Sequence, residues 1–337
     1  MKKIFNLIAS FVLLAGFSAC NKDGSDKPGL PPAPVPTVNY KGLTFISSGK
    51  STVCLAKVGA PDEITLEYST DESQWNPYTI GEKISMADGS FLLFRAGEQK
   101  NLTFSKGSDS YYHFEISGPV TAQGNIMSLL DRDFSTPLST NAFFALFEGC
   151  TSLLSAPELP ATTMEQGCYF RMFAECTGLK SAPELPAKEL AYNCYGWMFK
   201  GCSALTYVPD LPATEMVSYC YNNMFANCTS LKFAPELPAT RLDMGCYHCM
   251  FEGCTSLTSA PELPATELVG NCYEFMYKDC RNLRYVIGLF TTEPSEKTTK
   301  DWLSGVAASG TFIKSKKATW DVTSAHGVPE GWKIETW

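Results

Sequence analysis

Apolar residues recur along the middle of the chain with a constant period of 26 residues. The clearest markers are two series of cysteines that keep this interval. The first series is Cys150, Cys176, Cys202, Cys228, Cys254 and Cys280, and the second is Cys168, Cys194, Cys220, Cys246 and Cys272. A constant period of this length indicates one supersecondary unit stacked on copies of itself, because a single unit is too small to bury its own apolar face. The pattern therefore predicts a solenoid.

Each period contains two limbs with different spacing. In the first limb Leu179, Ala182 and Leu185 are apolar at intervals of three. Pro186, which has no backbone N–H to donate, then ends a short strand or extended turn. In the second limb Cys168, Met172 and Cys176 are four residues apart, the spacing that places side chains on one face of a short helix. The expected unit is strand, turn and short helix.

The pattern Met-Phe-x-x-Cys-x-x-Leu-x-x-Ala-Pro-x-Leu-Pro, which runs from Met172 to Pro186, resembles the BspA-type leucine-rich repeats of bacterial surface proteins. The resemblance covers roughly residues 143–290. This unit has 26 residues and carries Cys-Tyr where an Ile-Gly pair is usual in that family. The resemblance implies exposure at the cell surface and adhesion-like binding of macromolecules, and it implies no catalysis.

The segment before the repeats has a different pattern. Ile64, Leu66 and Tyr68 alternate with polar residues, and the same alternation recurs over residues 112–117. A period of two is typical of half-buried antiparallel strands, so we expect a β-sandwich over residues 38–122. Its role would be that of a spacer or of a second binding surface, and the sequence leaves both open.

The expected fold class is α+β, with the β-sandwich followed by a leucine-rich-repeat solenoid of 26-residue strand-turn-helix units. The solenoid with its N-terminal cap is expected over residues 123–290 and a C-terminal cap over residues 291–337. The last segment adds four tryptophans, Trp302, Trp320, Trp332 and Trp337. Bulky aromatic residues hide the open end of a repeat core well, which favours cap packing over a ligand site.

The first twenty residues predict export and a lipid anchor. Lys2 and Lys3 precede an apolar run over residues 4–17, which is too short to span a membrane. Small residues then stand before Cys20, which would become the acylated N-terminus of a bacterial lipoprotein; the alternative is an ordinary signal peptide. Residues 21–37 contain five prolines and are expected to form a semi-rigid linker.

Charge and composition narrow the classes of partner. The formal net charge is −8 and 45% of the residues are hydrophobic, which favours a folded protein that does not bind nucleic acid. No segment after residue 20 is long and apolar enough to span a membrane, so the lipid anchor is the expected membrane contact. We expect a monomer.

Candidate chemistry is sparse. The three histidines, His113, His248 and His326, lie in no recognisable catalytic motif, so we expect no enzyme activity and no cofactor. Cys246, His248 and Cys249 have the spacing of metal ligands, but Cys246 belongs to the repeating core series, so no metal site is expected. One acidic residue per repeat forms a column that would either attract cations or be a solvated edge: Glu158, Glu184, Asp210, Glu236 and Glu262. Most cysteines are expected to be reduced and buried.

Two columns vary most between repeats, and we take them as the candidate ligand-binding positions. One holds Tyr207, Phe233 and Tyr285 in the first limb, beside Lys232. The other holds Arg171 and Trp197 in the second limb. Exposed aromatic side chains with neighbouring cations are typical of contacts with proteins and sugars. The alternative is that they fill gaps between repeats.

The sequence thus favours a lipid-anchored, adhesin-like protein at the outer membrane or cell surface, which binds an extracellular protein or other macromolecule through its repeats. The alternative is a glycan-binding accessory lipoprotein of a nutrient-uptake system. Aromatic platforms on one face would favour a glycan, and a broader mixed face would favour a protein.

Overall fold

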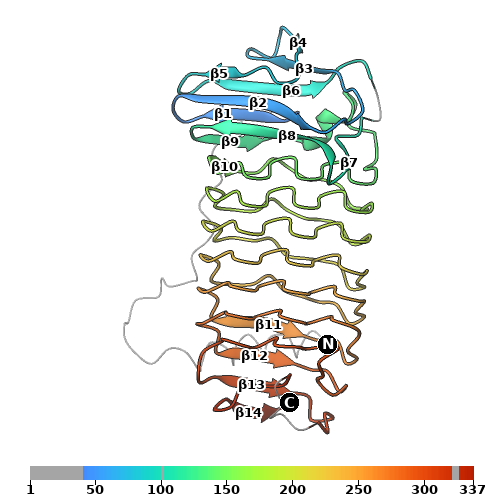
Figure 1. Ribbon diagram of the computed structural model, residues 1–337, viewed down its shortest axis with the longest axis vertical. Coiled ribbons are helices and arrows are strands. Elements are labelled where there is room, and N and C mark those ends of the chain that lie inside the picture. The colour runs from blue at the N-terminus through green and yellow to red at the C-terminus, as the bar shows by residue number, and fades with distance from the viewer. Residues whose placement is uncertain (1–40, 100–101, 321–325) are drawn as a thin grey trace, which may run out of the picture. The chain divides into compact units, whose positions relative to one another are not determined.

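The structure is a computed structural model that describes residues 41–99, 102–320 and 326–337 (Figure 1). The predicted signal peptide, Cys20 and the predicted linker lie outside these residues. The described residues belong to a single compact unit. In the described ranges no helix is long and apolar enough to cross a membrane.

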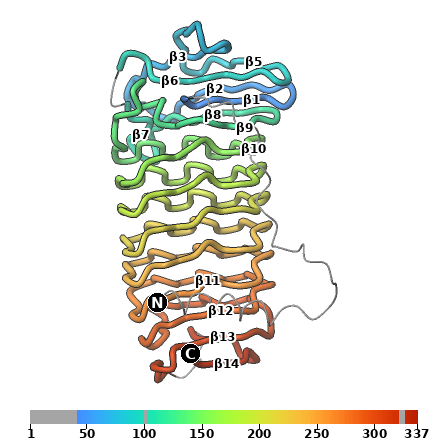
Figure 2. The backbone as a smooth tube through the Cα atoms, turned by 180° about the vertical axis from the view of Figure 1, so that it is seen from behind, coloured from blue at the N-terminus to red at the C-terminus, as the bar shows by residue number. Residues whose placement is uncertain are grey.

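The predicted α+β class is wrong, because the described residues contain no α-helix. Their one helical element is the short 3-10 helix η1 (Ile126–Leu129). The strands instead form three separate sheets, and no single sheet runs the length of the repeats. The predicted solenoid of strand-turn-helix units is therefore replaced by a nearly all-β chain of stacked coils, shown from behind in Figure 2.

Nine strands precede the repeats, and they include those expected from the alternating pattern. They are β1 (Thr44–Ser47), β2 (Ser51–Val58), β3 (Leu66–Ser69), β4 (Asn76–Tyr78), β5 (Ile84–Met86), β6 (Phe91–Ala96), β7 (Ser105–Gly107), β8 (Ser110–Ser117) and β9 (Val120–Gln123). Together with β10 (Leu153–Ser155) they form sheets of order β10-β9-β1-β6-β3-β4 and β5-β2-β8-β7. Phe45 of the first sheet meets Phe114 of the second with ring centroids 5.0 Å apart, so the sheets pack through an aromatic core.

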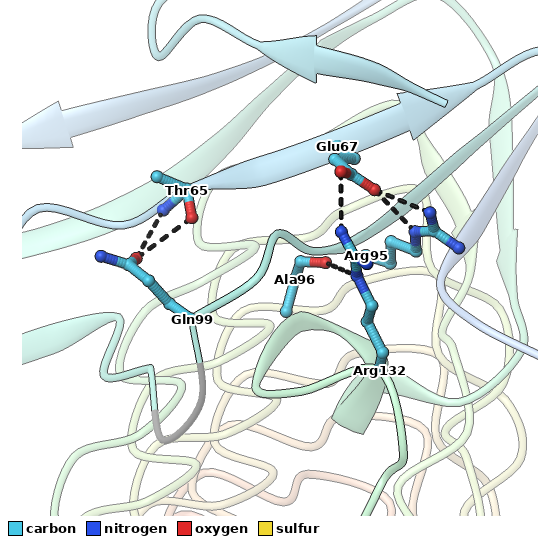
Figure 3. A network of polar contacts seen from close by, with 6 residues as sticks. All are labelled: Thr65, Glu67, Arg95, Ala96, Gln99 and Arg132. Atoms are coloured by element: carbon cyan, nitrogen blue, oxygen red, sulfur yellow. Dashed lines mark hydrogen bonds and ion pairs between the residues drawn. The ribbon is translucent and has the colours of Figure 1, made fainter. Parts of the chain in front are cut away.

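A polar network ties the first sheet to the segment that leads into the repeats (Figure 3). Glu67 of β3 accepts from Arg95 of β6 at 2.7 Å and from Arg132 at 2.7 Å. Arg132, which follows η1, also donates through Nε to the Ala96 carbonyl at 3.2 Å. One carboxylate thereby links two strands to the connecting segment.

The second limb of each coil, here called the turn limb (residues 167–176 and their equivalents), is a run of consecutive turns. Alternate amides donate within the coil to the third residue before, as from Met172 to the Tyr169 carbonyl at 3.2 Å. The amides between them donate to the next coil, as from Phe173 to the Met198 carbonyl at 2.9 Å. An α-helix would direct every amide to the fourth residue before. The turn limb therefore combines local turns with a ladder between coils.

The turn limb also explains why its spacing resembled that of a helix. Every fourth residue has a positive φ, as at Arg171 (58°) and Glu175 (59°), and a left-handed residue at this interval prevents a helix. The turn repeat is four residues long, so apolar residues four apart still share one face. One left-handed column alternates between glycine and residues with a carboxylate or amide: Gly149, Glu175, Gly201, Asn227, Gly253, Asp279 and Gly305.

The first limb, here called the proline limb (residues 179–187 and their equivalents), forms regular strands only near the two ends of the array. β10 pairs with β9, and a parallel four-stranded sheet is built from β11 (Ser259–Leu263), β12 (Tyr285–Gly288), β13 (Thr311–Lys314) and β14 (Lys333–Thr336). Between these ends the limb makes isolated bridges such as Ser181 to Tyr207. The recurring prolines remove ladder donors, which accounts for the interruption.

The core between the limbs consists of stacked columns. Tyr169 and its four equivalents stack with ring centroids 5.7–6.0 Å apart, and Phe147 and its next four equivalents stack at 5.3–5.7 Å. Each later cysteine of the first series donates its S–H to a phenylalanine carbonyl of the preceding coil, as Cys176 does to Phe147 at 3.0 Å. A small apolar side chain with a weak donor suits this position. All thirteen described cysteines are free and buried, and their burial confirms the prediction.

Aromatic residues cover both ends of the core. At the N-terminal end Phe114 stacks on Phe147 at 5.2 Å. At the C-terminal end Trp302, Trp320 and Trp332 are buried, as predicted for a cap, whereas Trp337 is 46% exposed and does not pack in it. Because one continuous core runs from the first sheets to Trp332, the boundaries at residues 122 and 290 correspond to no break in packing and remain predictions.

Candidate functional site: the outer face of the proline limb

Two adjacent coils expose large aromatic side chains on the proline limb. Tyr207 is 41% exposed and Phe233 is 65% exposed, while Leu205 and Leu231, two residues before them, are fully buried. Lys232 is exposed beside Phe233. Sister coils carry Ser181 and Ser259 at the same position. The predicted exposure of Tyr207 and Phe233 is confirmed, and the fold does not need an aromatic residue there.

Tyr285 belongs to the same column but is less accessible. It lies in β12, paired with Ser259 on one side and Thr311 on the other, and it is half-buried. Burial, followed by the nearby Glu335 carboxylate, raises the pKa of its hydroxyl. Tyr285 is thus partly exposed as predicted, but Ser259 separates it from Phe233.

A column of carboxylates follows the aromatic column three residues later in each coil. Its members are Glu158, Glu184, Asp210, Glu236 and Glu262. The first four are exposed, and no ion pair in the described ranges joins any of the five to a cation. Burial raises the pKa of the Tyr207 hydroxyl, and the Glu184 and Asp210 carboxylates raise it further. Burial and then Glu236 raise the pKa of Glu262.

An apolar groove lies on the same limb at the first two coils. It has a volume of about 250 Å³. It is lined by Ala156, Pro157, Leu159, Pro160, Pro183 and Pro186, together with Glu158 and Glu184 of the carboxylate column. This groove was not predicted from the sequence, although each proline limb carries a pair of prolines that could have indicated apolar surface.

Arg171 and Trp197 lie on the turn limb, apart from Tyr207 and Phe233. Arg171 forms an ion pair with Glu148 and lies 5.9 Å from the Trp197 ring centroid, and Lys200 lies 3.8 Å from the same centroid. Both residues are half-buried and have left-handed backbones. The structure therefore divides the six candidate residues between two limbs, and on the turn limb they contact each other.

The possible metal ligands do not form a metal site. Cys246 is fully buried in the core, whereas His248 Nε2 lies 3.8 Å from Cys249 Sγ and 3.6 Å from Glu274 Oε2. Burial raises the pKa of the Cys249 thiol and lowers the pKa of His248, so the thiol stays protonated at neutral pH. Within the described ranges, no three such side chains are placed to hold a metal ion.

A second depression, of about 360 Å³, lies on the turn limb. Its lining is polar and consists of Lys200, Asn227, Thr229, Glu252, Gly253, Thr255, Asp279 and Arg281. The depression was not predicted from the sequence. The available signal was the left-handed column that alternates glycine with amide and carboxylate side chains, because each glycine leaves a space between longer side chains.

No family model, curated protein or solved structure matches this chain.

Proposed function

We propose that this chain is a binding protein that holds an extracellular protein along the outer face of the proline limb. The observation that carries the proposal is the exposure of Tyr207 and Phe233 in adjacent coils at a position where serine suffices for the fold. Exposed aromatic residues with neighbouring charges are typical of interface anchors. The stacked coils would offer the partner a long row of equivalent positions.

The location of the protein is proposed from its sequence. The apolar run before Cys20 supports a lipid anchor at the outer membrane or cell surface, with residues 21–37 as a spacer. Replacement of Cys20 by serine should abolish fatty-acid labelling and membrane association. Equal labelling of both forms would contradict this part of the proposal.

A glycan is the second candidate ligand, and the turn limb supports it. The depression there is lined by carboxylate, amide, hydroxyl and cationic side chains, which hydrogen-bond hydroxyl groups well. Lys200 lines this depression and also covers the Trp197 ring, so an aromatic surface lies next to the polar groups.

The two candidates are separated by exposing the mature chain to an array of purified extracellular-matrix proteins and to an array of neutral glycans. The proposal expects capture by a protein, weakened at least about fivefold by Tyr207→Ser together with Phe233→Ser. Capture by glycans alone, weakened by Asp279→Asn and unaffected by the double variant, would support the second candidate and contradict the first.

A further inference from the structure

Three features of the proline limb lie side by side and together describe the partner. The aromatic row, defined as Tyr207, Phe233 and Tyr285, follows an intermittent row of cations. The acidic row, defined above by its five carboxylates, stands three residues further along each coil, about 10 Å away at about 3.3 Å per residue. The apolar groove lies on the same limb at the first two coils, and two members of the acidic row line it. The limb thus combines exposed apolar surface with a row of carboxylates, here called the negative flank.

The acidic row has no ion pair with a cation of this protein in the described ranges. Neighbouring coils in a parallel ladder are about 4.8 Å apart, so successive carboxylates repel one another. Two outward-facing carboxylates of the turn limb are instead paired within the protein, Glu148 with Arg171 and Glu252 with Lys278 at 3.4 Å. Lys180, Lys232 and Arg284 lie on the far side of the aromatic row and form no ion pair with the acidic row in the described ranges. A row of positive charges on a partner would remove the repulsion.

The spacing of the rows favours a helical partner that lies along the stack of coils. An α-helix repeats one face about every 5.4 Å, close to the coil spacing of about 4.8 Å. An extended strand repeats one face only about every 6.6 Å and would lose register with the acidic row sooner. The negative flank would also repel nucleic acid and sulfated glycans, since both carry dense negative charge.

We propose that the proline limb binds a basic amphipathic helix of a partner protein. Its apolar face would cover Tyr207, Phe233 and the apolar groove, and its lysine or arginine side chains would meet the acidic row. This inference rests on the proposed function, because it names the chemistry of the protein that the same surface would hold.

The test uses the mature chain and a synthetic helix of about 18 residues made of Leu, Lys and Ala, with Leu at helical spacing and Lys on one flank. The same peptide with Glu in place of Lys is the counter-probe. We expect the Lys peptide to bind, the Glu peptide not to bind, and the affinity to fall at least tenfold between about 50 mM and about 300 mM NaCl.

Two matched triple variants distinguish the effect of the acidic row on binding from the effect of the net charge of the protein. Glu184→Gln, Asp210→Asn and Glu236→Gln together should weaken the Lys peptide by about tenfold or more. The control variant removes the same number of exposed carboxylates outside the acidic row, by Glu165→Gln, Glu293→Gln and Glu296→Gln. It should change the affinity for the Lys peptide by less than about twofold. All six side chains are exposed, so both triple variants should melt like the native protein.

Equal weakening by the two triple variants would overturn the inference, because net charge alone would then explain binding. Failure of the Lys peptide to bind would also overturn it. If array proteins were still captured through Tyr207 and Phe233 in either case, the proposed function would stand with a partner of different chemistry. Loss of both kinds of binding would overturn the proposed function as well.

Discussion

The two limbs of each coil carry outward side chains of different kinds. On the proline limb Tyr207 and Phe233 are exposed, and the carboxylates beside them form no ion pairs in the part of the chain that the structure describes. On the turn limb Arg171 and Trp197 contact each other and their neighbours. The same degree of variation between coils therefore has two causes. On the proline limb the varying side chains are exposed. On the turn limb they contact other side chains of the protein.

The backbone explains the variation on the turn limb. The column of Arg171 and Trp197 is left-handed in every coil, and this conformation disfavours residues that have a Cβ, Asn and Asp less than the others. Contacts with the preceding and following coils then select which side chain each coil carries. Variation between coils therefore supports a ligand site only where the side chain is also exposed, as at Tyr207 and Phe233.

The largest effect is expected from alkaline pH, because the turn limb is anchored by buried thiols. Burial raises the pKa of Cys150 and Cys254 to about 12 and that of Cys272 to about 11, above the usual thiol value of 9.0. The unfolded chain releases these protons at lower pH than the folded chain does. The contribution of these neutral thiols to the free energy of unfolding is therefore fully present below about pH 9. It is lost as the pH rises toward 11 to 12.

Circular dichroism followed over this range should show cooperative loss of structure, accompanied by reaction of the thiols with a thiol reagent. At pH 7 the native chain should show few reactive thiols, and the denatured chain should show nearly all of them. Rapid reaction of most thiols in the native protein at pH 7 would contradict the buried core.

The next effect concerns the buried leucine column behind the exposed aromatic residues. Leu231→Ala leaves a cavity in a fully buried position and should lower the free energy of unfolding by about 2–5 kcal/mol. Tyr207→Ser with Phe233→Ser should change it by no more than about 0.5 kcal/mol, since serine occupies the same position in sister coils. Urea titration measures both. A similar loss in the two variants would mean that the aromatic residues are part of the core.

A smaller change in stability, that caused by Gly201→Ala, should have opposite signs for the turn limb and for a helix. In a helix Gly201→Ala would stabilise the protein by about 1 kcal/mol. In the structure Gly201 has φ 75° and an added Cβ would meet the Glu175 carboxylate, so alanine should destabilise the protein by about 1–2 kcal/mol. Thermal unfolding of this variant gives the sign, and an increase in melting temperature would contradict the turn limb.

The sequence predicted the burial pattern better than the backbone conformation. The cysteine period and the tryptophan cap followed from the need to bury apolar side chains, and three of the four tryptophans are buried. The helix prediction failed because Cys168, Met172 and Cys176 have the same spacing in a helix and in the turn limb. The alternation of glycine with Glu175, Asn227 and Asp279 could have indicated left-handed positions.

The candidate site was predictable only in part, for a related reason. Serine at the positions of Tyr207 and Phe233 in sister coils indicated that an aromatic residue was not needed for packing. The apolar groove depends on how neighbouring coils pack, which spacing along one chain does not report. The separation of Arg171 from Tyr207 depends on the path of the chain between the limbs.

The most direct test of the proline limb as the binding surface compares binding by one variant from each limb. The measurement is the affinity of the mature chain for a captured matrix protein, for the native form, for Tyr207→Ser with Phe233→Ser, and for Trp197→Asn. Asparagine is the residue that a sister coil carries at the position of Trp197. If the proline limb is the binding surface, the double variant should bind at least about fivefold more weakly and Trp197→Asn should differ by less than about twofold. If Trp197→Asn weakened binding and the double variant had no effect, the proline limb would not be the binding surface.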